Sequence, residues 1–166
     1  MTTQSIMTPD PVTVRVDSTV AGAVRLMHAH RVHDLPVVDQ EGCFAGMFGV
    51  RRLIRALLPV AAQLDHFGLT DLSYLPDDLP EVVERLSELG GQPVSHFLDK
   101  DKQVVCSCDT PLVELMHLLT TAESSLPVVV IRGERRKVVG MVSNWDVLTK
   151  IGARVFGQGE ATPPEK

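Results

Sequence analysis

The chain has 166 residues, of which 44% are apolar and 22% are charged, and a formal net charge of −5. These fractions are typical of a globular protein and exclude a wholly disordered or collagen-like chain. The acidic balance, with no basic run longer than Arg135-Arg136-Lys137, argues against a nucleic-acid-binding surface. There is no apolar run of the ~20 residues that span a membrane, no signal-peptide pattern at the start, and no disulfide framework in three cysteines. We therefore expect a cytoplasmic protein that binds neither nucleic acid nor membrane.

The first 57 residues predict a strand, a helix, two strands and a second helix, in that order. Residues 12–16 are rich in β-branched side chains and lead into Asp17-Ser18-Thr19, a helix-start signal. The next segment has the spacing of an amphipathic helix, whose apolar face carries Val20, Ala23, Val24 and Met27. Two apolar runs separated by a turn at residues 40–42 then indicate a β-hairpin, and a second helix follows from about Arg51.

Residues 58–92 predict a helical insert. Two prolines within residues 76–80 break the chain, and residues 81–89 form a helical pattern that ends at Gly90-Gly91. The apolar positions of this helix make a single stripe of Val82, Val83, Leu86 and Leu89. We expect the stripe to dock on the body of the protein.

The remaining residues repeat the first pattern. A β-rich stretch at residues 104–108 precedes an amphipathic helix with Leu112, Leu115, Met116 and Leu119 on one face. Two apolar runs follow, joined by a turn at Gly133-Glu134, and a helix starts at about Asn144. The segment from Gly157 onward is polar and is expected to fray.

The two patterns are copies of each other. Residues 14–20 align with 106–112, residues 35–38 with 126–129, and residues 46–48 with 140–142, always in the same order. We therefore expect a mixed α/β (α+β) fold of two β-α-β-β-α repeats. The expected boundaries are 4–57 for the first repeat, 58–92 for the insert, 93–152 for the second repeat and 153–166 for a flexible tail. A repeat of under 60 residues buries little core alone, so the copies should pack together.

Three motifs connect this pattern with a known family. They are Ile6-Met7-Thr8-Pro9-Asp10-Pro11, Leu35-Pro36-Val37-Val38-Asp39 and Gly140-Met141-Val142-Ser143-Asn144-Trp145-Asp146. With them the chain resembles the CBS-domain pair, or Bateman module, named after cystathionine beta-synthase. The resemblance implies two repeats packed about a pseudo-twofold axis, with clefts that bind adenine nucleotides or adenosyl compounds. It also implies a homodimer that regulates another protein and is not an enzyme.

The motif at the end of the second repeat suits an adenosyl ligand. The Asp146 carboxylate has two acceptor oxygens that can take hydrogen bonds from both ribose hydroxyls. Ser143 stands at a helix start, where free N–H groups suit a phosphate, and Gly140 allows a ligand or a backbone segment to come close. The same Ser-x-x-Asp spacing also indicates a helix-capping box. Both roles stay open.

The resemblance supplies the remaining candidate contacts in the second repeat. Val104, Val105 and Cys106 would lie beside the adenine, and Leu126 and Pro127 on its other side. For Val105 and Leu126 an ordinary core position is the alternative. The expected regulatory ligand is AMP, ADP, ATP or S-adenosylmethionine, and no cofactor is required.

The first repeat departs from the motif, since Gly49 replaces the hydroxyl and Arg52 replaces the carboxylate. An arginine carries only donors and cannot accept from a ribose. Either the first cleft is empty, or Arg51 or Arg52 holds a phosphate of a ligand shared with the other repeat. His33 is similar in position to a phosphate-binding histidine of some family members. We expect one nucleotide per chain.

Other site chemistries lack a supporting pattern. His28, His30 and His33 are close in sequence, as are Cys106 and Cys108, but neither group has the spacing of a known metal site. No nucleophile elbow, paired-carboxylate signature or P-loop is present. The first hypothesis is therefore a stand-alone ligand sensor with an unidentified regulated partner. The alternative is a ligand-free module for dimerisation or docking of a partner protein.

Overall fold

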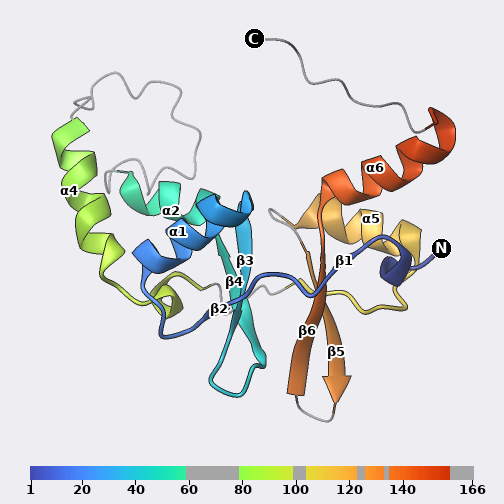
Figure 1. Cartoon of the computed structure of the whole chain (residues 1–166), viewed down its shortest axis with the longest axis horizontal. Coiled ribbons are helices and arrows are strands. Elements are labelled where there is room, and N and C mark those ends of the chain that lie inside the picture. The colour runs from blue at the N-terminus through green and yellow to red at the C-terminus, as the bar shows by residue number, and fades with distance from the viewer. Residues whose placement is uncertain (59–78, 99–103, 123–125, 133–134, 158–166) are drawn as a thin grey trace. The chain divides into compact units, whose positions relative to one another are not determined.

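The computed structural model describes residues 1–58, 79–98, 104–122, 126–132 and 135–157 (Figure 1). It divides into two compact units. The first-repeat unit comprises Val12–Gln103, and the second-repeat unit comprises Met1–Pro11 together with Val104–Lys166. Each unit combines helices with a three-stranded sheet, so the expected mixed fold is confirmed.

The first-repeat unit has the predicted order of elements. Its sheet has the strand order β2-β3-β4, with β2 parallel to β3 and β3 antiparallel to β4. The strands are β2 (Val14–Arg15), β3 (Asp34–Val38) and β4 (Phe44–Gly49), and the helices are α1 (Val20–His30), α2 (Val50–Leu57) and α4 (Leu79–Gly90). A 3-10 helix, η2 (Val94–Phe97), completes the unit. The helix α4 contacts α1 and α2 (Figure 1).

Helix α1 begins and ends where its sequence provides caps. The Thr19 side chain accepts a hydrogen bond from the Gly22 amide at 3.1 Å, as an N-cap threonine does. The helix ends at Arg31, whose φ of 53° places it in the left-handed region. Val20, Ala23 and Met27 are buried, and they form one core cluster with residues of β3 and β4 such as Leu35, Val37 and Phe48.

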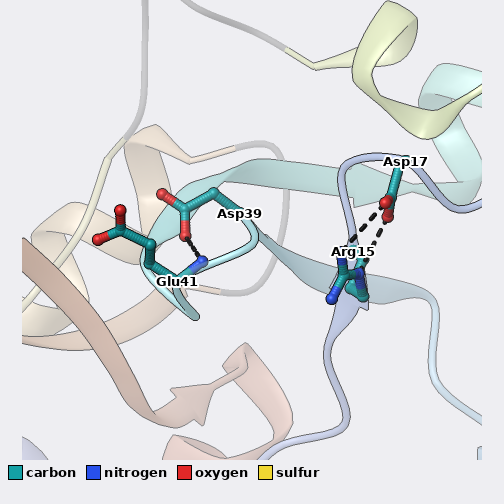
Figure 2. A network of polar contacts seen from close by, with 4 residues as sticks. All are labelled: Arg15, Asp17, Asp39 and Glu41. Carbon is teal, nitrogen blue, oxygen red and sulfur yellow. Dashed lines mark hydrogen bonds and ion pairs between the residues drawn. The ribbon is translucent and has the colours of Figure 1, made fainter.

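The β3–β4 hairpin is closed by the aspartate of the Leu-Pro-Val-Val-Asp motif. Asp39 Oδ1 accepts hydrogen bonds from the amides of Glu41 (2.9 Å) and Cys43 (2.8 Å). Gly42 has a φ of 77°, which glycine adopts without strain. Figure 2 shows this turn together with the Arg15–Asp17 ion pair, which is exposed. The predicted hairpin is confirmed, and Asp39 has a structural role in it.

The second-repeat unit has the strand order β1-β6-β5. Its elements are β1 (Thr8–Pro9), β5 (Leu126–Arg132), β6 (Arg135–Val142), the helices α5 (Leu112–Thr121) and α6 (Asn144–Val155), and the 3-10 helix η1 (Thr3–Ser5). The strand expected at residues 104–108 is reduced to a short contact, in which the Cys106 amide donates to the Pro127 carbonyl at 3.2 Å. The turn expected at Gly133-Glu134 and the tail beyond Gly157 lie outside the described residues.

The segment at the start of each repeat contributes to the unit of the other repeat. In the second-repeat unit, the amides of Thr3 and Gln4 donate to the carbonyls of Thr110 and Cys108, both at 3.0 Å. In the first-repeat unit, the amides of Val94 and Ser95 donate in the same way to Ser18 (2.9 Å) and Val16 (3.3 Å). Thr3 and Val94 are both fully buried. These equivalent bonds extend the internal repeat to residues that the sequence alignment leaves unmatched.

Helix α4 docks on the first-repeat unit as expected, since it contacts α1 and α2 and reaches the core cluster through Leu89. The other positions of its apolar stripe, Val82, Val83 and Leu86, are 37%, 57% and 42% exposed. Met116, expected on the buried face of α5, is 44% exposed because Leu115 and Leu119 occupy that face. The breaker at residues 76–78 lies outside the described part of the chain.

Candidate functional site

Ser143 and Asp146 meet at the N-terminus of α6. The Ser143 amide and hydroxyl both donate to Asp146 Oδ2, at 2.7 and 2.6 Å. The Asp146 amide donates to Ser143 Oγ at 3.2 Å. Together these bonds form the complete capping box that the spacing indicated. The structural interpretation of the Ser-x-x-Asp pattern is therefore observed.

The capping box uses only one of the two carboxylate oxygens. Within the part of the chain that the structure describes, the hydrogen bonds to the Asp146 side chain all fall on Oδ2. The side chain is half-buried, so the carboxylate keeps contact with the outside of the unit. A carboxylate oxygen has two lone pairs. The carboxylate is thus held in a fixed orientation while Oδ1 retains acceptor capacity.

The expected adenine contacts are divided between the two faces of the sheet. Cys106 and Leu126 are buried in the core cluster, and Val104 packs against that cluster. Since side chains alternate along extended chain, Val105 and Pro127 belong to the opposite face. Val105 is half-buried, whereas Pro127 is buried. Cys106 and Leu126 have core positions, which were the alternative for Leu126.

Met141 joins this second face and was not predicted. It pairs with Pro127 in the β5–β6 ladder, and residues paired in a ladder point to the same side of the sheet. Ser143 follows Met141 by two residues and has extended backbone, with φ −110° and ψ 165°. The side chains of Pro127, Met141 and Ser143 therefore leave the sheet on one side. Counting the hairpin register from Leu126 would have identified Met141.

Gly140 provides room for protein and not for a ligand. A Cβ atom at this position would lie 2.6 Å from Met7 Sδ and 3.2 Å from the Thr8 carbonyl oxygen. Thr8 and Pro9 form β1, which pairs with β6 at Met141 and Gly140. Two reasons for a glycine were expected here, and the close approach of a backbone segment is the one observed.

The Cys106 thiol is inert in this environment. Burial raises its pKa to about 11, and the neighbouring Cys108 adds to the rise. The Cys106 sulfur lies 3.7 Å from the Pro127 carbonyl oxygen. A thiol with this pKa stays protonated at neutral pH and is a poor nucleophile.

The candidate phosphate contacts of the first repeat lie around the start of α2. The guanidinium of Arg52 donates to the Phe97 carbonyl at 3.2 Å and so joins α2 to η2. Arg51 and His33 are exposed, and the His33 carbonyl accepts from the Val50 amide at 2.9 Å. The structure thus brings His33 close to the start of α2, and it gives Arg52 a structural contact.

The described residues also bear on metal binding and on membrane insertion. Among the described residues, no three side chains of the His, Cys, Asp or Glu types lie close enough to hold a metal ion. Within the same residues, no helix is both long and apolar enough to cross a membrane.

A family comparison identifies the repeat. The CBS domain model matches residues 4–59 and 94–153. The chain belongs to the CBS-domain family. A CBS domain-containing protein of Dictyostelium discoideum is 29% identical over 146 residues, which are 87% of each chain.

Solved structures of CBS pairs have the same fold. CBSX2 from Arabidopsis thaliana is 20% identical, with a TM-score of 0.70 over 95% of this chain and 98% of that one. A complex of CBSX2 with AMP is also similar, with 20% identity and a TM-score of 0.64 over 93% of this chain and 98% of that one. The CBS pair of protein MJ0100, in complex with 5'-methylthioadenosine and S-adenosyl-L-methionine, is 16% identical, with a TM-score of 0.63 over 93% of this chain and 98% of that one. At these identities the likeness establishes the fold.

Proposed function

We propose that this chain is a stand-alone regulatory CBS pair that binds an adenine nucleotide or related adenosyl compound on its second repeat, and that it is not an enzyme. The observation that carries the proposal is the Asp146 carboxylate, fixed by its cap with Oδ1 left to accept. Membership of the CBS family and the adenosyl ligands in the related structures support the ligand class.

The chemistry of this end of the sheet fits the two halves of adenosine. Val105 and Met141, which are both half-buried, offer an apolar surface for a flat purine, and backbone N–H and C=O groups can form hydrogen bonds with its nitrogens. The Asp146 carboxylate accepts from the ribose hydroxyls, and the start of α6 suits a phosphate or another anionic group. A ribose is common to AMP, ADP, ATP and S-adenosylmethionine, so these residues select the adenosyl part first.

Thermal unfolding of the purified chain against these four compounds tests the proposal. A ligand present at 100 times its dissociation constant adds about 2.7 kcal/mol to the stability. At roughly 2–4 °C per kcal/mol, the midpoint should rise by about 5–10 °C. A selective rise identifies the ligand. An unchanged midpoint with all four at millimolar concentration contradicts ligand binding and leaves the alternative, a ligand-free docking module, which the loss of the motif at Gly49 and Arg52 favours.

We further propose that two copies associate through the outer faces of α5 and α6. Four large apolar side chains on these faces are exposed: Val113 and Met116 on α5, and Trp145 and Leu148 on α6. The exposed fractions of Val113 and Trp145 are 80% and 74%. On the first repeat, α4 packs against α1, and a Cβ atom added at Gly90 would lie 3.5 Å from Ala21 Cβ. The second repeat has no such cover among the described residues.

A second copy is the occupant that suits this face. The exposed side chains at its centre are uncharged, so the same face on another copy meets it without like-charge repulsion, as a twofold contact requires. Because an aromatic side chain alone buries about 150–250 Å², this face supplies much of the ~800 Å² per partner of a stable interface.

Sedimentation measures this association directly. Leu148→Asp should convert the dimer to a monomer, whereas Val83→Asp, at an equally exposed apolar position on α4, should not. A wild-type chain that sediments as a monomer at tens of micromolar contradicts the proposed face.

Three further properties belong to the same proposal. The repeats are expected at 4–57 and 93–152, with an insert at 58–92 and a tail at 153–166. We expect the chain to act in the cytoplasm on a protein partner, without contacting nucleic acid or membrane.

A further inference from the structure

Helix α2 starts without the side chains that cap α6. Its N-cap residue is Gly49, which has no side chain to accept a hydrogen bond, and its first turn contains no acidic residue. Instead it contains Arg51 and Arg52, two cations at the positive end of the helix dipole. The same helix end in the second repeat has Ser143 and Asp146. Something else must therefore supply negative charge at the start of α2.

A carboxylate from the neighbouring strand occupies this place. Asp34 is the residue paired with Gly49 in the β3–β4 ladder. A Cβ atom built on Gly49 would collide with Asp34 Oδ1 and would lie 3.6 Å from both Asp34 Cγ and the His33 carbonyl oxygen. The Asp34 carboxylate thus stands where the side chain of an N-cap residue would begin. A side chain at position 49 would therefore require the Asp34 carboxylate to move from its present position.

We infer that Asp34 and Gly49 form one coupled unit that replaces the missing serine cap and closes the first repeat to anionic ligands. The inference rests on the proposed function for its ligand, but the coupling of the two residues does not. In the second repeat the negative charge comes from within the helix, at Asp146. In the first repeat it comes from the adjacent strand and lies over the helix start.

The position of the charge decides what else can bind there. A phosphate approaching the start of α2 meets the Asp34 carboxylate at short range, where two like charges repel. It also meets an occupied volume, since the carboxylate lies where a capping side chain would stand. Of the two alternatives for the first repeat, this arrangement favours an empty site over a phosphate held by Arg51 or Arg52. Asp34 is then the residue that restricts the ligand to the second repeat.

A double-mutant cycle tests the coupling without any ligand. Gly49→Ser should lower the unfolding midpoint by roughly 5 °C, because the new side chain collides with Asp34. Adding Asp34→Ser removes the collision and supplies a hydroxyl cap, so the double variant should be more stable than Gly49→Ser alone. Gly91→Ser is the matched control, because a Cβ there meets only the Glu88 carbonyl at 3.9 Å. A Gly49→Ser variant as stable as Gly91→Ser, or strictly additive effects in the cycle, overturns the inference.

Calorimetric titration with AMP tests the restriction of the ligand. The wild-type chain should bind one AMP, and a chain carrying Asp34→Ser, Gly49→Ser and Arg52→Asp should bind a second. Two AMP molecules on the wild-type chain overturn the inference. A wild-type chain that binds none of AMP, ADP, ATP and S-adenosylmethionine contradicts the proposed function, while the stability cycle still decides whether Asp34 and Gly49 are coupled.

Discussion

Replacement of Asp146 separates the role of this residue in capping from its role in binding. Asp146→Ala removes the acceptor for the Ser143 amide and hydroxyl. Loss of a helix cap costs about 1 kcal/mol, which for a chain of this length lowers the unfolding midpoint by roughly 2–4 °C. If the carboxylate also accepts from both ribose hydroxyls, AMP binding loses a further ~2–3 kcal/mol, or roughly 30- to 150-fold in affinity.

Two other variants isolate the binding effect. Thr19→Ala removes a cap of the same kind from α1, where the Thr19 side chain accepts from Gly22, so it should cost similar stability and leave AMP affinity unchanged. Asp146→Glu keeps a capping box, since glutamate is common at this position, but moves the carboxylate by one methylene. It should keep the stability and lose affinity.

The assay is calorimetric titration with AMP alongside thermal unfolding of each variant. Equal affinities for wild-type, Asp146→Ala and Asp146→Glu chains would refute the binding role and leave Asp146 as a cap. An equal loss of affinity in Thr19→Ala would show that the effect acts through stability.

Three further predictions concern the second-repeat unit. Gly140→Ala should destabilise the chain by about 1–3 kcal/mol, because the added methyl group would overlap Met7. Urea denaturation measures this loss, and an unchanged midpoint contradicts the close approach of β1. Folding raises the pKa of Cys106 from an ordinary 9.0 to about 11. As the pH rises, the thiol therefore ionises in the unfolded chain before it does so in the folded one. The free energy of unfolding should be unaffected below about pH 9 and should fall as the pH rises toward 11. Across this pH range, the unfolding midpoint of Cys106→Ala should fall less steeply than that of the wild-type chain, and an equal slope for both would contradict the role of Cys106. Deletion of residues 1–11 should raise hydrogen exchange in α5 and β6 but not in α1 and β3, because Ile6 is part of the second-repeat core; an equal rise in both units would be evidence against separate cores.

The sequence was sufficient for the repeated fold and for most element boundaries. Both repeats carry strong local signals: Thr19 starts α1, and Asp39 with Gly42 turns the β3–β4 hairpin. The helix expected from about Asn144 begins at that residue. These features depend on neighbours in the sequence, so local patterns can predict them.

The missed features depend on contacts between distant residues. The exchange of residues 1–11 and of η2 between the units depends largely on backbone hydrogen bonds between residues far apart in the sequence, which local side-chain patterns do not predict. The α4 stripe had helical spacing, but spacing does not show how much of a stripe finds a partner. The closeness of Asp34 to Gly49 depends on the register of β3 against β4, which pairs the two residues.

The two helix starts together show why the Ser-x-x-Asp pattern alone could not separate a cap from a ligand contact. A helix end needs an acceptor for its free N–H groups whether or not a ligand binds. In the second repeat one carboxylate oxygen of Asp146 meets this need and the other is left for a ligand. In the first repeat, where Arg52 cannot do either, the Asp34 carboxylate lies beside Gly49, where the side chain of a capping residue would begin. The need for a cap therefore persists where the ligand motif is lost, and the direction from which the carboxylate arrives distinguishes an open helix start from a closed one.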